Sequence, residues 1–182
     1  MRYIVCGSYR TGTSAIVRAV TESSSIPAYI DLSVDELIRS REIDPAYNPN
    51  PWGYFSHGSM FAPISEWIGN TTDGSVMKAA PEAFYFNAST EPLCVVLTSR
   101  DPEESAASYT RSFGTPSIID RTSLLSQVEG ILLSASNVTL TKINFSDLIN
   151  NPINFFNNLN TAGWPIDPQI AASTIDPLLK RF

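Results

Sequence analysis

The sequence lacks the features of a membrane-spanning or exported chain. No apolar run approaches the ~20 residues that a helix needs to cross a bilayer. The first predicted strand begins at Arg2, which leaves no room for a signal peptide before it. Cysteine is also scarce, since Cys6 and Cys94 are the only two and both fall in predicted core strands. We therefore expect free, buried thiols and a cytoplasmic protein.

Histidine and positive charge are scarce as well. His57 is the single histidine, and the Asp, Glu, His and Cys residues show no metal-ligand spacing, so no metal is expected. The chain has 12 Lys and Arg against 18 Asp and Glu, a formal net charge of −6. This balance argues against a general nucleic-acid or membrane-surface binder. A small anionic ligand is compatible with it, because Arg10, Lys78 and Arg100 fall near predicted strand ends and could form a locally positive pocket.

The start of the chain contains an anion-binding pattern. The segment RYIVCGSYRTGTSAIVRAV, residues 2–20, has the pattern of a short buried strand, a turn bounded by Gly7 and Gly12, and a helix. The backbone N–H groups of such a turn point inward, and the helix dipole adds partial positive charge. This segment therefore predicts a site for phosphate or sulfate.

The turn has the GxxxxG spacing of a nucleotide-phosphate loop, but its lysine is missing. Thr13 and Ser14 follow Gly12, where nucleoside triphosphatases have Lys and then Ser or Thr. Arg10 is the one cation inside the turn. Because that lysine contacts the β- and γ-phosphates, its absence disfavours ordinary ATP or GTP chemistry. The alternative is a strand–helix turn whose glycines occur by chance.

Two segments together resemble the sulfotransferases that use phosphoadenosine phosphosulfate (PAPS). YRTGTS, residues 9–14, is similar to their phosphosulfate-binding loop, where a basic residue, a small residue and Gly precede two Ser or Thr residues. Arg100, Pro102 and Ser108 are similar to a second motif, Arg-Asn-Pro at a strand end followed by Ser eight residues after the Arg. Asp101 replaces the usual Asn and is expected to cap the following helix.

This resemblance implies a PAPS donor site. In the family the second Arg and Ser hold the extra ribose phosphate, and an arginine fork suits a phosphate dianion in geometry and charge. The implied donor-binding residues are Tyr9, Arg10, Thr11, Gly12, Thr13, Ser14, Arg100 and Ser108.

Other segments are weaker matches to the same family. Lys78 begins KAAPEAFYF, which resembles a family stretch after the third strand. In NPWGYFS, Ser56 stands where bacterial relatives often have Glu, and Phe145 replaces a family Tyr near the C-terminus. The glycine-rich closing loop of larger relatives has no clear counterpart, and Lys180 and Arg181 are the only late basic residues.

Alternating strands and helices, together with the resemblance, predict one domain over residues 1–182. Its expected fold is a three-layer α/β fold of the P-loop nucleoside-triphosphate-hydrolase type, with a central parallel sheet of about five strands flanked by helices. Ser33 is expected to cap its helix, with Glu36 completing a capping box. Residues 43–56, rich in proline and aromatics, are expected to form a binding surface or a rigid cover. The expected strands are Arg2–Cys6, Ala28–Asp31, Ser75–Ala79, Leu93–Ser99 and Val138–Asn144, and the expected helices are Thr13–Ser23, Ser33–Arg41, Gly58–Ile68, Pro102–Ser112, Arg121–Ala135, Pro152–Ala162 and Pro168–Ile175.

The resemblance implies metal-independent sulfuryl transfer to a hydroxyl or amine of a small-molecule or carbohydrate acceptor. Arg10 and Lys78 would stabilise charge on the sulfonate and the bridging oxygen. Arg10 is expected to act electrostatically, because a guanidinium does not readily donate its proton. The general base stays open between His57 and a carboxylate of the second helix, Asp35 or Glu36. The alternative is that His57 has a structural role and that the carboxylates of Asp35 and Glu36 cap the helix.

Two other classes of function stay open. One is a nucleotide or nucleoside kinase on the same fold, which would depend on magnesium. The other is a sulfotransferase-like protein that binds nucleotide without catalysis, a reading that the short chain and Ser56 support. The sequence does not determine the acceptor or the oligomeric state.

Overall fold

A parallel sheet of four strands lies at the centre of the computed structural model, which describes residues 1–44, 47, 50–85, 90–115 and 122–176. All three pairs of neighbouring strands are parallel, with Val5 beside Lys78 and Gly7 beside Thr98. The two central strands are buried along nearly their whole length, which agrees with their continuous apolar sequences. The strands, in their order across the sheet, are β2 (Val76–Ala79), β1 (Arg2–Gly7), β3 (Leu93–Ser99) and β4 (Val138–Asn144).

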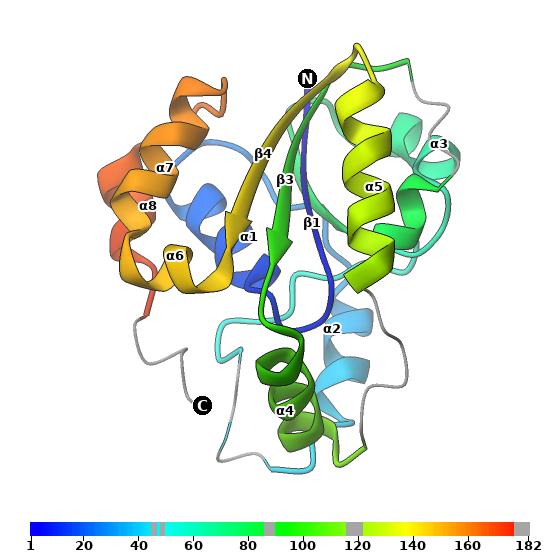
Figure 1. Cartoon of the computed structure of the whole chain (residues 1–182), viewed down its shortest axis with the longest axis vertical. Coiled ribbons are helices and arrows are strands. Elements are labelled where there is room, and N and C mark those ends of the chain that lie inside the picture. Colours follow the sequence, from blue (N-terminus) through cyan, green and yellow to red (C-terminus); the bar gives the residue numbers. More distant parts are fainter. Residues whose placement is uncertain (45–46, 48–49, 86–89, 116–121, 177–182) are drawn as a thin grey trace.

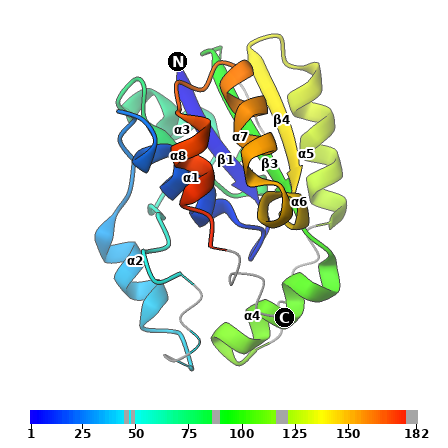
Figure 2. The same cartoon turned by 90° about the vertical axis from the view of Figure 1, so that its left-hand side faces the viewer.

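Helices cover both faces of this sheet (Figures 1 and 2). Successive side chains of β1 point to opposite faces: Tyr3 and Val5 join the core on one side, and Ile4 and Cys6 join the core on the other. The expected α/β class and helix-flanked parallel sheet are therefore confirmed. The first face carries α1 (Thr13–Glu22), α6 (Phe145–Asn150), α7 (Pro152–Thr161) and α8 (Pro168–Ser173), and the second carries α3 (Ile64–Trp67), η1 (Ile68–Asn70), η2 (Pro81–Phe84) and α5 (Thr122–Ser134).

Two further helices lie beyond the carboxyl ends of the strands, at the bottom of Figure 1. They are α2 (Leu32–Arg39) and α4 (Pro102–Phe113). As predicted, Asp101 caps α4: its carboxylate accepts hydrogen bonds from the backbone N–H groups of Glu103 and Glu104 at 2.9 and 3.1 Å. Ligands of open parallel sheets bind at this edge, so α2 and α4 flank the place where a site is expected.

The prediction of about five strands was too high for the described residues, which form four. Segment 28–31 makes a single parallel bridge, Ala28 to Val76, in place of a strand. The chain leaves the sheet because Asp31 caps α2, accepting from the N–H and hydroxyl of Ser33 at 2.9 and 2.7 Å. Asp31 is therefore the N-cap that the sequence analysis had assigned to Ser33.

Helix prediction failed most clearly over residues 58–68. That span forms one turn of helix, α3, followed by the short 3₁₀ segment η1. Pro63 accounts for the late start, because a proline disfavours helical backbone in the residue before it and is tolerated only at the first turn. Helix α6 was not predicted, while the other helices end within about two residues of the expected positions, a normal uncertainty. Arg121, the expected first residue of α5, lies outside the described residues.

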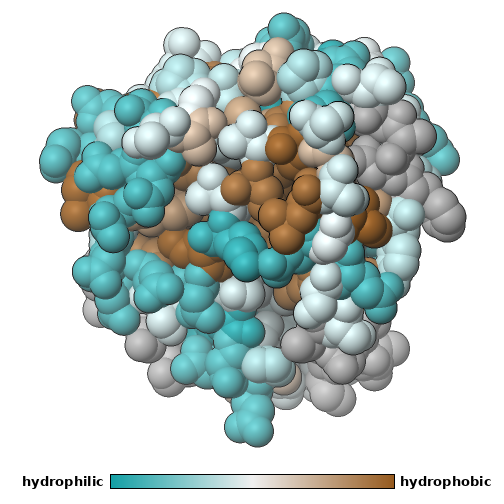
Figure 3. Space-filling model, turned by 45° about the horizontal axis from the view of Figure 1, so that its top comes forward, coloured by the Kyte–Doolittle hydropathy of each residue, from teal (hydrophilic) through white to brown (hydrophobic). Residues whose placement is uncertain are grey.

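The cysteines and the molecular surface were also compared with the expectations from the sequence. Cys6 and Cys94 are buried thiols outside any disulfide, as predicted. No helix among the described residues has the length and apolar character required to cross a membrane. On the face shown in Figure 3, hydrophobic residues gather near the middle, between hydrophilic surfaces. Apolar side chains are therefore present on the surface as well as in the two cores.

Candidate functional site

The turn between β1 and α1 is held by close contacts that require its two glycines. A Cβ on Gly7 would lie 1.9 Å from Thr98 Oγ1. Gly12 has a left-handed φ of +87°, and its Cβ would lie 2.9 Å from Phe145 Cδ2. No side chain caps the first turn of α1 among the described residues, so its N–H groups can bind an anion.

The hydroxyl of Thr11 holds the turn from inside. Thr11 is buried, and its Oγ1 lies 2.9 Å from the Ser8 carbonyl and 2.6 Å from Thr98 Oγ1. Thr98 in turn donates to the Cys6 carbonyl at 3.2 Å. The sequence analysis expected Thr11 to bind the donor, but these contacts direct its hydroxyl into the protein. Thr13 and Ser14, by contrast, line a cavity above the turn.

Lys78 lies at the floor of that cavity. Its ammonium donates to Ser14 Oγ at 3.2 Å and to the Tyr54 carbonyl at 2.7 Å. The pKa of Lys78 is lowered to about 8, mainly by burial and in part by the nearby Arg10, while Asp35 opposes the shift. The structure thus places a lysine beside the turn, although it comes from β2 and not from the turn itself.

Arg10, Arg100 and Ser108 meet at one point. Arg10 Nε donates to Ser108 Oγ at 3.0 Å, although the two residues are 98 positions apart. Arg100 Nη1 donates to the Arg10 carbonyl at 3.1 Å, and its guanidinium lies 4.3 Å from the centre of the Phe145 ring. Burial and the neighbouring Arg100 lower the pKa of Arg10, although the guanidinium still stays protonated at neutral pH. The two sequence motifs therefore form one cationic site.

The cavity has a volume of 570 Å³. Among the described residues, its lining includes four cations and no carboxylate: Arg10, Arg41, Lys78 and Arg100. The chain as a whole carries a net charge of −6, so positive charge is concentrated here against the overall balance. Such a cavity attracts anions because low-dielectric walls strengthen the field of the cations.

Asp35 is not placed to act as a base. Its carboxylate accepts three backbone hydrogen bonds, from Tyr54 at 2.8 Å, Phe55 at 2.9 Å and Ser56 at 2.8 Å. This contact shapes residues 54–56, where Phe55 has a positive φ of 53°. The same bend presents the Tyr54 carbonyl to Ser14 and Lys78. Asp35 therefore positions the cavity wall instead of facing the cavity.

This role leads to a stability prediction. Replacing Asp35 with alanine leaves three backbone N–H groups without their acceptor, and we expect a loss of roughly 2–4 kcal/mol of unfolding free energy. Urea denaturation followed by tryptophan fluorescence measures it. Glu36→Ala, at an exposed neighbour on α2, is the control and should change stability by less than about 0.5 kcal/mol. Unchanged stability of Asp35→Ala would contradict this role.

His57 lines the cavity but is mostly enclosed. Its Nε2 lies 2.7 Å from the Lys78 carbonyl, so this nitrogen carries the proton and donates. The ring contacts Tyr29 and Trp67 edge to face, at centroid distances of 5.0 and 4.9 Å. Burial is the main cause that lowers the pKa of His57, which favours the neutral ring at neutral pH. Its Nδ1 is buried and has no hydrogen-bond partner among the described residues. This nitrogen can therefore accept a proton, but only from a group that enters the wall of the cavity.

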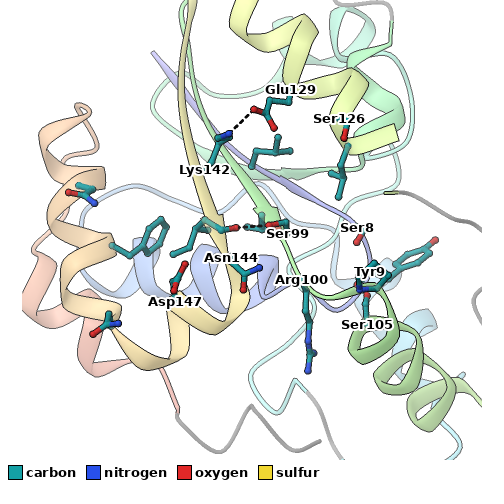
Figure 4. Close-up of a pocket in the computed structure, with 18 of the residues that line it drawn as sticks. Ser8, Tyr9, Ser99, Arg100, Ser105, Ser126, Glu129, Lys142, Asn144 and Asp147 are labelled. Carbon is teal, nitrogen blue, oxygen red and sulfur yellow. Dashed lines mark hydrogen bonds and ion pairs between the residues drawn. The ribbon is translucent and has the colours of Figure 1, made fainter. Parts of the chain in front are cut away.

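A second cavity, of 840 Å³, opens on the other side of the turn (Figure 4). Ser8, Tyr9 and Arg100 line both cavities. The far wall of the second cavity is rich in carboxamides and includes Asn144 and Asp147, which lie together in Figure 4. The two cavities are therefore neighbours, with Ser8, Tyr9, Arg100 and Tyr109 between them.

Several contacts of this region were missed by the sequence analysis. Ser105 donates to the Tyr9 carbonyl at 2.5 Å and ties the turn to α4. The Tyr54 carbonyl, a backbone group, has no sequence signal at all. Asn144 and Asp147 lie in a segment recognised only as a weak family match. No group of three or more potential ligands among the described His, Cys, Asp and Glu residues is arranged for a metal ion.

Comparisons with known proteins add little. No protein-family model matches the chain, and no curated protein does so significantly. A solved structure that matches is an unliganded sugar kinase from Janibacter sp. HTCC2649, with 10% sequence identity and a TM-score of 0.45. The match covers 93% of this chain and 96% of that one. Similarity at this level does not determine what the chain binds or catalyses.

Proposed function

We propose that this protein is a sulfotransferase that takes a sulfuryl group from PAPS, on a fold of the P-loop nucleoside-triphosphate-hydrolase type. The observation that carries the proposal is the convergence of Arg10, Arg100 and Ser108 at the glycine-bounded turn between β1 and α1. A donor with anionic groups at two places needs several cations close to one another, and this site brings Arg10 and Arg100 together. The absence of a carboxylate among the described residues that line the first cavity also favours a polyanion held without a metal.

The residues divide between the two ends of the donor. The amides of the turn, with Thr13, Ser14 and Lys78, would hold the phosphosulfate end. Arg100 and Ser108 would hold the ribose phosphate. The nucleoside would extend into the second cavity, where Asn144 and Asp147 offer hydrogen-bonding groups. Ser8 and Tyr9 line both cavities, so they would contact the part of the donor that connects its phosphosulfate end to its nucleoside.

The proposed chemistry is an in-line transfer. The acceptor oxygen or nitrogen attacks sulfur, the bond from sulfur to the bridging oxygen breaks, and the adenosine bisphosphate leaves with the electron pair. Arg10 and Lys78 would stabilise the charge that develops on the bridging oxygen. The acceptor's proton would pass to a base, for which His57 Nδ1 is the candidate among the bases expected from the sequence, since Asp35 is engaged with backbone and Glu36 lines neither cavity.

Calorimetric titration tests the donor site. We expect adenosine 3′,5′-bisphosphate to bind more tightly than adenosine monophosphate, because the second phosphate meets Arg100 and Ser108. Arg100→Ala should remove most of this preference, a loss on the order of 1.5–3 kcal/mol for a charge-assisted contact. Arg18→Ala is the control, since Arg18 pairs with Glu22 and lines neither cavity. Equal affinity of the two nucleotides for the unaltered protein would refute the proposal.

A kinase is the second candidate, and one contact favours it. Lys78 Nζ lies 3.2 Å from Ser14 Oγ, so a lysine is present beside the turn despite its absence from the loop sequence. The structural similarity to the sugar kinase is too low to add support. A kinase would bind ATP with magnesium more tightly than adenosine bisphosphate, which the same titrations measure. Binding of bisphosphate without any transfer would indicate the non-catalytic alternative.

A further inference from the structure

The hydroxyl of Ser108, which the proposed function assigns to the ribose phosphate, is closed off in this structure. Ser108 is fully buried and lines neither cavity, whereas Arg100 lines both. Its Oγ already accepts a hydrogen bond from Arg10 Nε at 3.0 Å. A phosphate that entered from either cavity would therefore reach Arg100 but not Ser108.

Tyr47 covers Ser108. Its hydroxyl oxygen lies 3.4 Å from Ser108 Oγ, and only 4% of the surface of Tyr47 is exposed. A hydrogen bond between Tyr47 and the Arg10 side chain is among the contacts that oppose the lowering of the Arg10 pKa by burial. Tyr47, Arg10 and Ser108 therefore form one buried hydrogen-bonded cluster.

The ring of Tyr47 is held on α4 by a second contact. The guanidinium carbon of Arg111 lies 4.4 Å from the ring centre, and the two groups attract each other through the negative face of the ring. Arg111 and Ser108 are three residues apart on α4, so they share a face of that helix. Tyr47 itself belongs to no helix or strand. Its place on α4 therefore depends strongly on these side-chain contacts.

The backbone of Arg10 is also fixed by groups of the proposed phosphate site. Arg10 has a left-handed φ of +64°, which is uncommon for a residue other than glycine. Such backbone persists where the surrounding contacts determine it. Ser108 holds the Arg10 side chain at 3.0 Å, and Arg100 Nη1 donates to the Arg10 carbonyl at 3.1 Å. A ribose phosphate and the closed arrangement would thus compete for Arg100 and Ser108.

We propose that the contact of Tyr47 with Ser108 is autoinhibitory, and that the ribose phosphate of the donor displaces the Tyr47 hydroxyl when it binds. This inference rests on the proposed sulfotransferase function. Part of the binding free energy of the donor is spent on opening the cluster, so the apparent affinity is reduced by the fraction of molecules that are open. Changes that loosen Tyr47 should therefore strengthen donor binding.

Calorimetric titration of the whole protein with adenosine 3′,5′-bisphosphate and with adenosine monophosphate tests this proposal. Tyr47→Phe should raise the affinity for the bisphosphate about three- to tenfold, because it removes one hydrogen bond of the closed state. The affinity for the monophosphate should not change, since that ligand has no second phosphate to place at Ser108. The ring and its contact with Arg111 stay in place, so the variant should fold.

Arg111→Gln is a second, independent variant. It removes the cation that holds the Tyr47 ring, and we expect the bisphosphate to bind about two- to fivefold more tightly relative to the monophosphate. Loss of a positive charge by itself would have the opposite effect, because the bisphosphate is the more highly charged ligand. The direction of the change therefore separates release of Tyr47 from general electrostatic attraction.

Tyr85→Phe is the control. It removes a tyrosine hydroxyl that donates to Gln127 Oε1 at 2.9 Å, and Tyr85 lines neither cavity. It should leave the ratio of the two affinities unchanged. An unchanged or lower ratio in Tyr47→Phe or in Arg111→Gln would overturn the autoinhibitory role of Tyr47. Equal affinities of the unaltered protein for the two nucleotides would instead refute the proposed function.

Discussion

Replacing Arg10 with alanine is expected to lower the rate of sulfuryl transfer about 10²–10³-fold, while the affinity for adenosine 3′,5′-bisphosphate falls less than about tenfold. In the proposed reaction the guanidinium would stabilise the charge that builds on the bridging oxygen, so its contribution would be larger in the transition state than in the ground state. The amides of the turn and Lys78 remain in the variant to hold the donor. Arg10→Lys should keep partial activity, because a point charge can serve in the same place.

Single-turnover kinetics with PAPS, combined with calorimetry of the bisphosphate, measures both effects on the same variant. Arg18→Ala on α1 is the matched control and should change neither quantity, since that arginine lies outside both cavities. Loss of activity equal to the loss of affinity would mean that Arg10 binds the donor without stabilising the transition state. Full activity of Arg10→Ala would exclude the proposed role of the turn.

Gly7→Ala is expected to destabilise the protein strongly, with a loss of about 2 kcal/mol or more of unfolding free energy. Its added Cβ would meet Thr98 Oγ1 at 1.9 Å, and Thr98 is fully buried in the central strand β3. Either the strands separate or the hydrogen bonds of Thr98 to Thr11 and Cys6 are lost. Because these contacts also shape the turn, bisphosphate binding should fall with stability.

Urea denaturation of Gly7→Ala and Gly130→Ala tests this expectation. Gly130 lies in α5 with nothing within 4 Å of its added Cβ, so alanine there should stabilise the protein by about 0.5–1 kcal/mol. Opposite signs for the two glycines are the expected result. A Gly7→Ala protein as stable as the unaltered one would show that the strand contact can relax without cost.

The parts of the fold that the sequence predicted well are governed by local interactions. Strands β3 and β4 were predicted with their observed bounds. Strand β3 is a nearly continuous apolar run, as expected for a covered parallel strand, and the edge strand β4 is rich in the β-formers Val, Thr and Ile. Asp101 and Pro102 begin α4 as expected, since an N-cap depends on N–H groups two or three residues away. The cap of α2 was assigned two residues late, because Asp31 and Ser33 are both good caps and local pattern does not choose between them.

The roles of single side chains were harder to predict. Asp35 has the position of a capping or catalytic carboxylate in the sequence, but it binds the N–H groups of Tyr54, Phe55 and Ser56 about twenty residues away. Thr11 belongs to the binding motif, yet its hydroxyl turns toward Thr98, which is 87 positions distant. These partners are distant in the chain, and no local sequence pattern indicates them. The sequence could therefore single out Asp35 and Thr11 without predicting what they contact.

The sequence by itself determined that a glycine-bounded turn joins the first strand to the first helix and that Arg100 directly follows a buried strand. Both follow from residue types that act on near neighbours, namely glycines, β-formers and helix caps. Only the tertiary structure decided that Arg10 lies on Ser108, that Lys78 reaches Ser14, and that Tyr47 covers Ser108. These contacts depend on how strands align within the sheet and where α2 and α4 leave it, which is set by packing between residues far apart in the chain.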